Sequence, residues 1–224
     1  MIKLVIFDLD GTLLDVSERY YRSIKDTLHS HNLNCPPKEK VISLKRQGLQ
    51  GIQILDILVP TTIKEREDVI KKCEIDRIER MNKYLYLDKL FPNVIDTLRK
   101  LQKRTKIALL TLRKSYSKTI EQISELNIID FFDLVEVLTP KGDFSELKFL
   151  SGMKICRYLS INSADCCIVG DSIYEMIAGK KMGARTTIGV SYGLTDREIL
   201  LSKGASYLIS DIKEILPIIE NIVK

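Results

Sequence analysis

Short apolar runs recur along the chain, and each is followed by a polar residue or a glycine. They cover residues 3–7, 106–110, 166–169, 186–190 and 206–209. Runs of four or five residues are typical of strands that are buried on both faces. Apolar residues also recur at helical spacing, which predicts helices over residues 94–103, 115–126, 146–159, 173–182, 196–203 and 212–223. Strands that alternate with helices indicate crossover connections and a mostly parallel sheet.

Residues 15–87 interrupt this alternation, because they carry helical patterns without a strand-like run. The patterns cover residues 17–30, 38–49, 51–59 and 63–87. Prolines lie between them, at Pro36, Pro37 and Pro60, where helices are expected to end. The sequence therefore predicts an α/β protein with two domains. Residues 1–14 and 88–224 form a doubly wound, Rossmann-like parallel sheet core, and residues 15–87 form an inserted all-helical domain.

Composition and charge argue against several kinds of binding partner for this protein. The chain has 224 residues, 45% of them hydrophobic, and a formal net charge of +5. Its basic residues are spread along the sequence, which is typical of a solvated surface and argues against nucleic-acid binding. No apolar run approaches the about 18 residues of a membrane-spanning helix, and the N-terminus lacks an export signal. A cytoplasmic protein without a membrane partner is therefore expected. The five cysteines include no C-x-x-C pair, which argues against a zinc site or a disulfide framework.

Polar side chains stand at the carboxyl ends of three predicted strands. Asp8 follows the first run, Thr111 the second and Asp171 the third. In a parallel sheet these ends share one edge, where the ligands of such sheets bind. Asp10 follows Asp8 by two residues, and carboxylates beside a buried strand require a nearby cation. Mg²⁺ suits such an oxygen site, and Gly11 lets the backbone turn and present its amides to an anion.

These residues resemble the motifs of the haloacid dehalogenase superfamily, specifically its phosphoglycolate phosphatase-like phosphatases with an all-helical cap domain. The first motif, D-x-D-x-[TV], matches Asp8–Thr12. The second, a Ser or Thr that ends the next core strand, matches Thr111. The fourth, G-D-x-x-x-[DE], matches Gly170–Glu175. The matches occur in the family's order and cover nearly the whole core.

The resemblance implies a hydrolase that uses Mg²⁺ to remove phosphate from a small phosphorylated metabolite. Asp8 is expected to attack phosphorus and form an aspartyl-phosphate. Asp10 is expected to protonate the leaving alcohol and then to activate water. A halide needs no such proton, so Asp10 favours phosphate chemistry over dehalogenation. The implied metal ligands are Asp8, Asp10 (through its backbone carbonyl), Asp171 and Glu175. The expected contacts to the substrate phosphate are Leu9, Gly11, Thr12, Thr111 and Leu112, with Arg113 as a further candidate.

The family's third motif is a lysine, and two residues compete for it here. Ser145 is expected to cap the next helix, which puts Lys148 at its third residue and favours Lys148 as a catalytic residue. Lys141, in the preceding loop, is the alternative. Glu175 is longer than the Asp that is commoner at its position, so it either reaches the metal or orients a lysine. Arg113 either binds a phosphate through two guanidinium donors or is an ordinary surface residue.

The inserted helical domain is expected to act as a cap that contacts the leaving group and so selects the substrate. The candidates for this contact are Tyr20, Arg46, Gln47 and Gly48. The sequence identifies neither the metabolite nor the oligomeric state, so monomer and homodimer both stay open. A phosphosugar mutase of the same superfamily, similar to β-phosphoglucomutase, is the alternative function. A catalytically idle binding module on the same fold is a second alternative, against which Asp10 argues.

Overall fold

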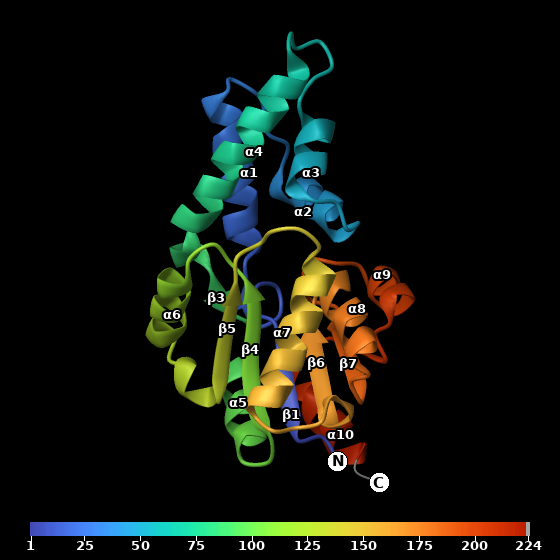
Figure 1. The fold of residues 1–224 in the computed structure, drawn as a ribbon. Coiled ribbons are helices and arrows are strands. Elements are labelled where there is room, and N and C mark those ends of the chain that lie inside the picture. The colour runs from blue at the N-terminus through green and yellow to red at the C-terminus, as the bar shows by residue number, and fades with distance from the viewer. Residues whose placement is uncertain (223–224) are drawn as a thin grey trace. The chain divides into compact units, whose positions relative to one another are not determined.

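The chain forms two units in the computed structural model, which describes residues 1–222 (Figure 1). The core unit consists of Met1–Asp15 and Leu90–Lys224, and the helical unit consists of Val16–Lys89. The predicted division at residues 15–87 differs from this one by one residue at its start and by two at its end. Two short strands, β2 (Leu14–Asp15) and β3 (Lys89–Leu90), form a two-stranded sheet of their own.

The core unit is built on a six-stranded sheet in which every neighbouring pair of strands is parallel. Its strands, in spatial order, are β5 (Leu134–Leu138), β4 (Lys106–Leu112), β1 (Leu4–Phe7), β6 (Cys166–Gly170), β7 (Thr186–Val190) and β8 (Tyr207–Ile209). From β1 the chain first adds β4 and β5 on one side and then β6, β7 and β8 on the other. The direction of winding therefore changes at β1, and ligands of such sheets bind beyond the strand ends at this point.

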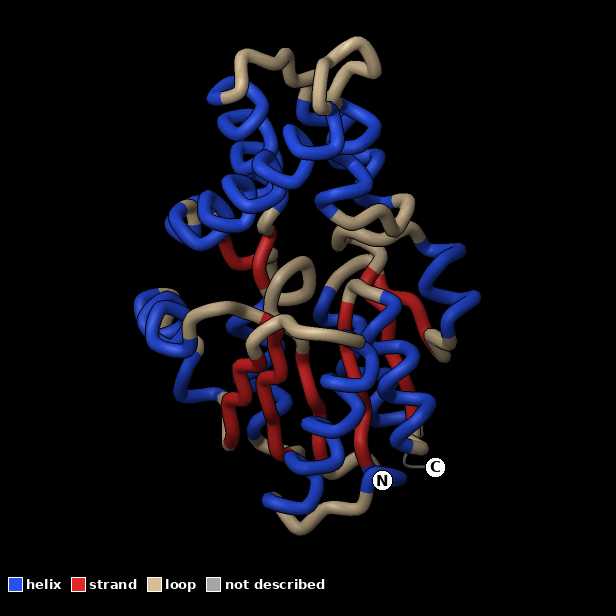
Figure 2. Tube along the Cα trace, turned by 45° about the horizontal axis from the view of Figure 1, so that its top comes forward, coloured by secondary structure: helices blue, strands red, loops and turns tan. Residues whose placement is uncertain are grey.

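Helices cover both faces of the sheet, as Figure 2 shows. They are α5 (Val94–Gln102), α6 (Tyr116–Glu125), α7 (Phe144–Tyr158), α8 (Ile173–Met182), α9 (Arg197–Lys203) and α10 (Ile215–Asn221). On one face, Ile155 and Cys156 of α7 and Met182 of α8 belong to the same buried cluster as Leu4 and Ile6 of β1. Removal of these apolar side chains from water holds the helices on the sheet. The doubly wound parallel core expected from the sequence is confirmed.

The apolar pattern predicts five of the six strands but not β5. Glu136 interrupts the apolar residues of β5, and all of its residues are only half-buried at the edge of the sheet. The edge position leaves Glu136 free to pair with Lys154 at 2.9 Å. A strand of this kind lacks the continuous apolar run that identifies a strand buried on both faces.

Two helix starts in the core unit differ from the prediction by more than one residue. The residue that caps α7 is Asp143, whose carboxylate accepts a hydrogen bond from the Ser145 N–H at 2.8 Å. The prediction of Ser145 as the N-cap is therefore wrong, and Lys148 is the fifth helical residue rather than the third. The predicted helix over residues 212–223 is divided into a 3-10 helix, Ile212–Glu214, and α10. The last residue of that prediction lies outside the described residues.

The helical unit contains no strand apart from its end in β3. It consists of α1 (Ser17–Ser30), α2 (Lys38–Arg46), α3 (Gly51–Leu58), α4 (Arg66–Lys83) and a short 3-10 helix (Leu85–Leu87). One buried cluster joins the four α-helices and includes Ile24, Leu28, Val41, Ile54 and Cys73. The prediction of an inserted all-helical domain is confirmed.

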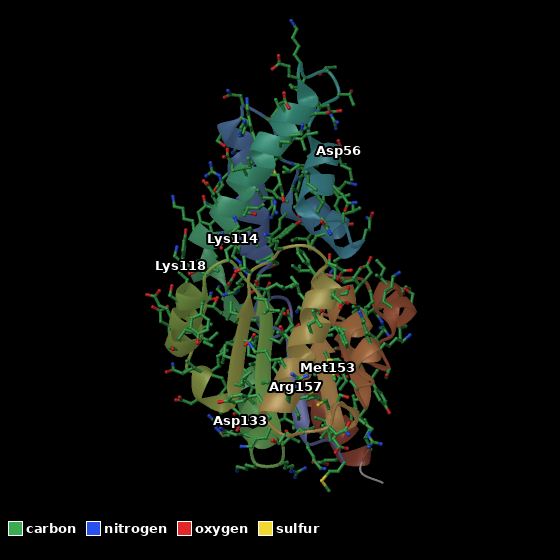
Figure 3. All side chains as sticks on the ribbon, viewed as in Figure 1. Asp56, Lys114, Lys118, Asp133, Met153 and Arg157 are labelled. Carbon is green, nitrogen blue, oxygen red and sulfur yellow. The ribbon has the colours of Figure 1, made fainter. Side chains whose placement is uncertain are left out.

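Charged side chains are spread over both units, and Figure 3 labels Asp56, Lys114, Lys118 and Asp133 among them. All four are exposed. The net charge of +5 therefore lies on a surface of mixed sign. Of the helices within residues 1–222, none is long and apolar enough to cross a membrane.

Candidate active site

Asp8 continues the line of β1 into the turn that carries the first motif. Its N–H donates to the carbonyl of Val169 in β6 at 2.9 Å, which extends the parallel ladder by one residue. The turn then closes on the carbonyl of Leu9, which accepts hydrogen bonds from the N–H groups of residues 12–14. Gly11 has a φ of +81°, a conformation that glycine adopts without strain. The turn leaves the Asp8 carboxylate buried at the carboxyl edge of the sheet.

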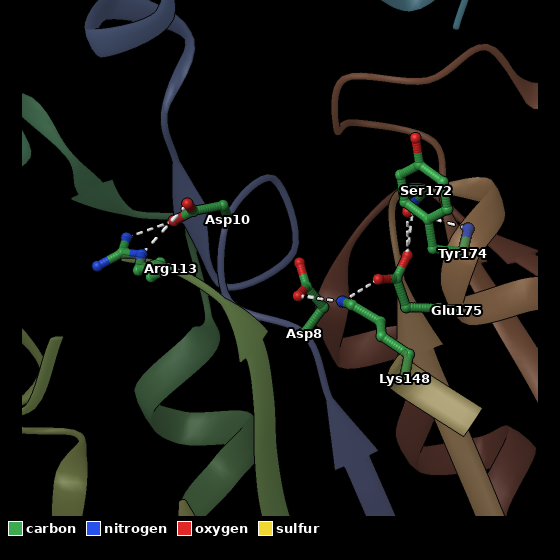
Figure 4. A network of polar contacts seen from close by, with 7 residues as sticks. All are labelled: Asp8, Asp10, Arg113, Lys148, Ser172, Tyr174 and Glu175. Carbon is green, nitrogen blue, oxygen red and sulfur yellow. Dashed lines mark hydrogen bonds and ion pairs between the residues drawn. The ribbon is translucent and has the colours of Figure 1, made fainter. Parts of the chain in front are cut away.

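Lys148 connects two buried carboxylates that come from different elements (Figure 4). Its Nζ donates to Oδ1 of Asp8 at 2.6 Å and to Oε1 of Glu175 on α8. The second oxygen of Glu175 accepts hydrogen bonds from Ser172, from its N–H at 3.0 Å and from its hydroxyl at 2.5 Å. Lys141 is exposed in the loop before α7. Of the two candidate lysines, the structure thus brings Lys148 into contact with Asp8.

Burial and neighbouring charges shift the pKa values of Asp8 and Lys148 together. Burial raises the pKa of Asp8 to about 8; Lys148 acts to lower it, and Glu175 and Asp171 act to raise it. Burial by itself would lower the pKa of Lys148, but the carboxylates of Asp8 and Glu175 raise that pKa above its ordinary value. Asp8 therefore lies near two other carboxyl groups and one ammonium group, so acidic groups are in excess around it.

Asp171 directly follows β6 and is buried beside the turn of the first motif. Its Oδ2 accepts a hydrogen bond from the N–H of Leu194, in the loop after β7, at 2.7 Å. Gly11 and Gly193 lie so close to the Asp171 side chain that a Cβ at either position would collide with it. The two glycines therefore make the room in which the Asp171 carboxylate lies.

The carboxylate of Asp10 has a different partner from that of Asp8. Arg113, immediately after β4, donates through Nε to Oδ2 of Asp10 at 3.2 Å and through Nη2 to Oδ1. Its Nη1 donates to Oε1 of Gln122 on α6 at 2.5 Å. Arg113 is only 7% exposed, so the alternative of an ordinary surface residue is wrong. The guanidinium directs two of its donors at Asp10 rather than at a phosphate site (Figure 4).

The other predicted contacts to phosphate lie on the same edge of the sheet. Thr111 and Leu112 are the last two residues of β4, which runs past the predicted strand end, and Thr111 is buried. Leu9 is buried in the turn after β1. The hydroxyl of Thr12 is buried without a hydrogen-bond partner among residues 1–222. The carbonyl of Thr12 accepts a hydrogen bond from the hydroxyl of Tyr192 at 3.0 Å.

The four candidates for substrate contact in the helical unit have different environments. Tyr20 is buried in the core of that unit, whereas Arg46 is half-buried at the end of α2. Gln47 and Gly48 are exposed in the turn before α3, and Gly48 has a φ of +83°.

Sequence reasoning missed Ser172, Gln122 and the loop 192–194. Ser172 and Glu175 form a capping box at the start of α8, and its S-x-x-E spacing is readable in the sequence. The loop follows β7 at the same edge of the sheet as Asp8, and its position after a predicted strand is the signal that would have found it. Gln122 has no such signal, because its contact with Arg113 depends on how α6 packs.

The acidic groups at this edge fit a magnesium ion held by two carboxylates. Within the described part of the chain, no group of three or more His, Cys, Asp or Glu side chains forms a ready-made metal site. Asp171 is nevertheless close enough to Asp8 to raise its pKa, and a divalent cation between the two would relieve that repulsion. Mg²⁺ commonly uses one or two carboxylates and completes its shell with substrate phosphate and water. Asp8 and Asp171 follow the neighbouring strands β1 and β6 and lie near each other, so they are the side chains that fit.

The fold and the strand-end carboxylates define a hydrolase of one known family. Residues 5–189 match the family described as haloacid dehalogenase-like hydrolase, and the chain belongs to this family. The predictions of the family and of a hydrolase are therefore confirmed.

Full-length similarity to individual proteins agrees with this family. A pyrophosphatase PpaX from Oceanobacillus iheyensis is 26% identical, and the match covers 97% of each chain. A predicted phosphoglycolate phosphatase from Haemophilus somnus has a solved structure with a TM-score of 0.76 and 21% identity, covering 97% of each chain. A predicted phosphatase from Clostridium acetobutylicum has a TM-score of 0.76 and 20% identity, covering 99% of each chain. These structures share the whole fold of this chain, including its helical unit.

Proposed function

We propose that this protein is a Mg²⁺-dependent phosphatase that hydrolyses a small phosphomonoester through an aspartyl-phosphate on Asp8. The observation that carries the proposal is the environment of Asp8. Its buried carboxylate stands at the end of the central strand, hydrogen-bonded to Lys148 and beside Asp171. A carboxylate nucleophile in such a position can attack an electrophile that approaches the carboxyl edge of the sheet.

The reaction divides into two displacements at phosphorus. In the first, an Asp8 oxygen attacks phosphorus, the bond from phosphorus to the alcohol oxygen breaks, and Asp10 gives a proton to that oxygen. In the second, water attacks the phosphorus of the aspartyl-phosphate, Asp10 accepts a proton from the water, and phosphate leaves with the Asp8 carboxylate restored. Asp10 thus acts first as acid and then as base, which requires its carboxyl group to face both oxygens.

Charge is the main obstacle to this reaction, because an anionic nucleophile must approach an anionic phosphate. Lys148 supplies one positive charge to Asp8, and we propose that Glu175 holds Lys148 there rather than binding the metal. When bound, Mg²⁺ would neutralise part of the remaining negative charge and orient the phosphate. Asp8 and Asp171 are the proposed side-chain ligands, and the backbone carbonyl of Asp10 is a third.

The phosphoryl oxygens need hydrogen-bond donors as well as charge. Thr111 and the amide of Leu112 are the proposed donors at the end of β4. The backbone of Leu9, Gly11 and Thr12 is proposed to complete the phosphate site on the other side. The unpartnered hydroxyl of Thr12 supports this proposal, because a buried hydroxyl without a partner costs free energy that a ligand could recover.

Two classes of substrate fit this chemistry, a small phosphomonoester and pyrophosphate. A small phosphorylated metabolite is expected from the family resemblance. Pyrophosphate is favoured by the similarity to the pyrophosphatase PpaX over 97% of the chain. Pyrophosphate has a better leaving group than an alkyl phosphate, so the same two displacements would serve it.

The first experiment is Asp8→Asn, assayed for phosphate release. The substitution keeps the size of the side chain but removes the nucleophile, so activity is expected to fall by more than about a thousandfold. Asp96→Asn is the matched control, because Asp96 is an exposed residue of α5, where it pairs with Arg99. Wild-type rates in Asp8→Asn would refute the nucleophile.

A panel of substrates separates the remaining alternatives. Phosphoglycolate, sugar phosphates, nucleoside monophosphates and pyrophosphate are each assayed with Mg²⁺ and then with excess chelator. Loss of phosphate release on chelation is expected, and activity indifferent to chelation would refute the metal. Conversion of one sugar phosphate into its isomer with little release of phosphate would instead support the phosphosugar mutase.

A further inference from the structure

Arg113 holds Asp10 through two hydrogen bonds. The expected role of Asp10 as an acid and base does not by itself require this contact. Both of its carboxylate oxygens accept hydrogen bonds from Arg113, one from Nε at 3.2 Å and one from Nη2. The Asp10 side chain is 28% exposed and that of Arg113 only 6%. A planar guanidinium with two donors fixes the plane of a carboxylate as well as its position.

Arg113 is itself held from two other elements. Its N–H donates to the carbonyl of Leu138, at the end of β5, at 2.9 Å. Its Nη1 donates to Oε1 of Gln122 on α6 at 2.5 Å. The backbone of Arg113 and the guanidinium at the tip of its side chain are therefore both held by hydrogen bonds. The orientation of Asp10 is in this way tied to β4, β5 and α6.

The two carboxylates of the first motif thus have different cations. Asp8 pairs with a lysine, which is a compact charge without a preferred plane, and Asp10 pairs with an arginine, which imposes one. Figure 4 shows the two pairs on opposite sides of the first-motif turn. A nucleophile on which charge builds up benefits from a charge nearby. A group that transfers protons benefits from a defined direction.

We infer that Arg113 is a positioning residue that aims the Asp10 carboxyl group for proton transfer, with Gln122 holding Arg113 in place. This inference rests on the proposed function. It replaces the expectation that Arg113 binds the substrate phosphate, since the donors suited to a phosphate are directed at Asp10.

The test uses two substrates whose leaving groups differ in their need for a proton. Departure of 4-nitrophenolate needs no proton, so Arg113→Met should form the aspartyl-phosphate from 4-nitrophenyl phosphate at near the wild-type rate. The second step still needs Asp10 as a base. The variant should therefore release a burst of one nitrophenolate per site and then turn over slowly, about 10- to 100-fold below wild type. With an alkyl phosphate both steps need Asp10, so the loss should be larger and no phosphoenzyme should accumulate.

A double variant tests whether Arg113 acts through Asp10. If it does, Asp10→Asn with Arg113→Met should be no slower than Asp10→Asn alone, within about twofold. Arg113→Lys should restore part of the rate, and Gln122→Leu should reproduce part of the loss. Arg99→Met, which removes an exposed arginine of α5, is the matched control and should match wild type. Thermal unfolding of each variant identifies any that fail to fold. If Arg113→Met does not fold, Gln122→Leu and Arg113→Lys provide the test.

Other results would overturn the inference that Arg113 positions Asp10. A raised KM with unchanged kcat for both substrates would make Arg113 a phosphate ligand and overturn the inference. Equal losses for both substrates without a burst, or additive losses in the double variant, would also overturn it. In each of these outcomes the wild-type enzyme is still active, so the proposed function remains intact. A wild-type protein that hydrolyses neither these esters nor pyrophosphate would overturn the proposed function and the inference with it.

Discussion

Among single residues, Tyr20 carries a buried hydroxyl that lacks a hydrogen-bond partner within residues 1–222. Its ring lies in the core of the helical unit, with Nζ of Lys45 at 5.6 Å from the ring centroid. Burial raises the pKa of Tyr20 to about 12, with Arg77 acting to lower it and Glu74 to raise it. The ring therefore contributes to packing, whereas the hydroxyl costs free energy, on the order of 1–3 kcal/mol for such a group.

Tyr20→Phe is expected to keep or raise the free energy of unfolding at pH 7, by up to about 1 kcal/mol, because it removes only the hydroxyl. The wild-type tyrosine should also add a pH dependence. Its pKa is higher in the folded state, so its contribution to stability is complete below the unfolded value of about 10 and is lost as the pH rises towards about 12.

Urea unfolding of both proteins at pH 7 and pH 11 measures this difference. Between pH 7 and pH 11, the free energy of unfolding should fall less in Tyr20→Phe than in the wild type. A greater loss in the variant would contradict the expectation. An increased KM in Tyr20→Phe would indicate that the hydroxyl contacts the substrate, as the sequence suggested.

At the scale of elements, the site depends on two loops that approach Asp171 closely. Gly11 lies in the turn after β1, and Gly193 lies in the loop after β7. A Cβ on either would collide with the Asp171 side chain. Both loops leave the same edge of the sheet, so neighbouring strand ends converge on one carboxylate.

Gly11→Ala and Gly142→Ala separate this close approach from backbone strain. The two glycines have nearly the same φ, +81° and +80°, but a Cβ on Gly142 meets nothing within 4 Å. Both variants are expected to lose about 1 kcal/mol of stability from the left-handed backbone. Only Gly11→Ala should also lose activity, by at least about tenfold, because Asp171 must move. Equal kcat values in the two variants would contradict this explanation.

The elements also differ in how far the sequence predicts them. The strands β1, β6 and β7 contain no charged residue, because every residue in them is buried. The edge strand β5 is not predicted by a continuous apolar run, because it is only half-buried and contains Glu136. The start of α7 is displaced because the carboxylate of Asp143, and not the hydroxyl of Ser145, accepts the free N–H groups. The side that α7 turns towards Asp8 is nevertheless the side that carries Lys148.

At the scale of the whole molecule, the core unit holds more buried negative groups than positive ones around Asp8. Asp8, Asp171 and Glu175 are buried there, and the cation Lys148 pairs with Asp8 and Glu175. Buried charges without compensation destabilise a folded protein, so a cation that binds only the folded state should stabilise it.

Thermal unfolding with and without Mg²⁺ tests this balance without any substrate. Mg²⁺ at a hundred times its Kd is expected to stabilise the wild type by about 2.7 kcal/mol. Asp171→Asn should lose this effect, and without the metal it should be at least as stable as the wild type, because one repulsive charge is gone. Glu175→Gln should keep the Mg²⁺ effect if Glu175 orients Lys148. Loss of the effect in Glu175→Gln would make Glu175 a metal ligand.

The sequence by itself determined the parallel core, the inserted helices and the strand-end positions of Asp8, Thr111 and Asp171. These features follow from local patterns, since the period of apolar residues and the polar residue after each run can be read within a few positions. Only the tertiary structure decided which lysine meets Asp8, that Arg113 meets Asp10, and that Glu175 meets Lys148. Those contacts join residues 27 to 140 positions apart, and they depend on how helices pack on the sheet, which no local pattern records.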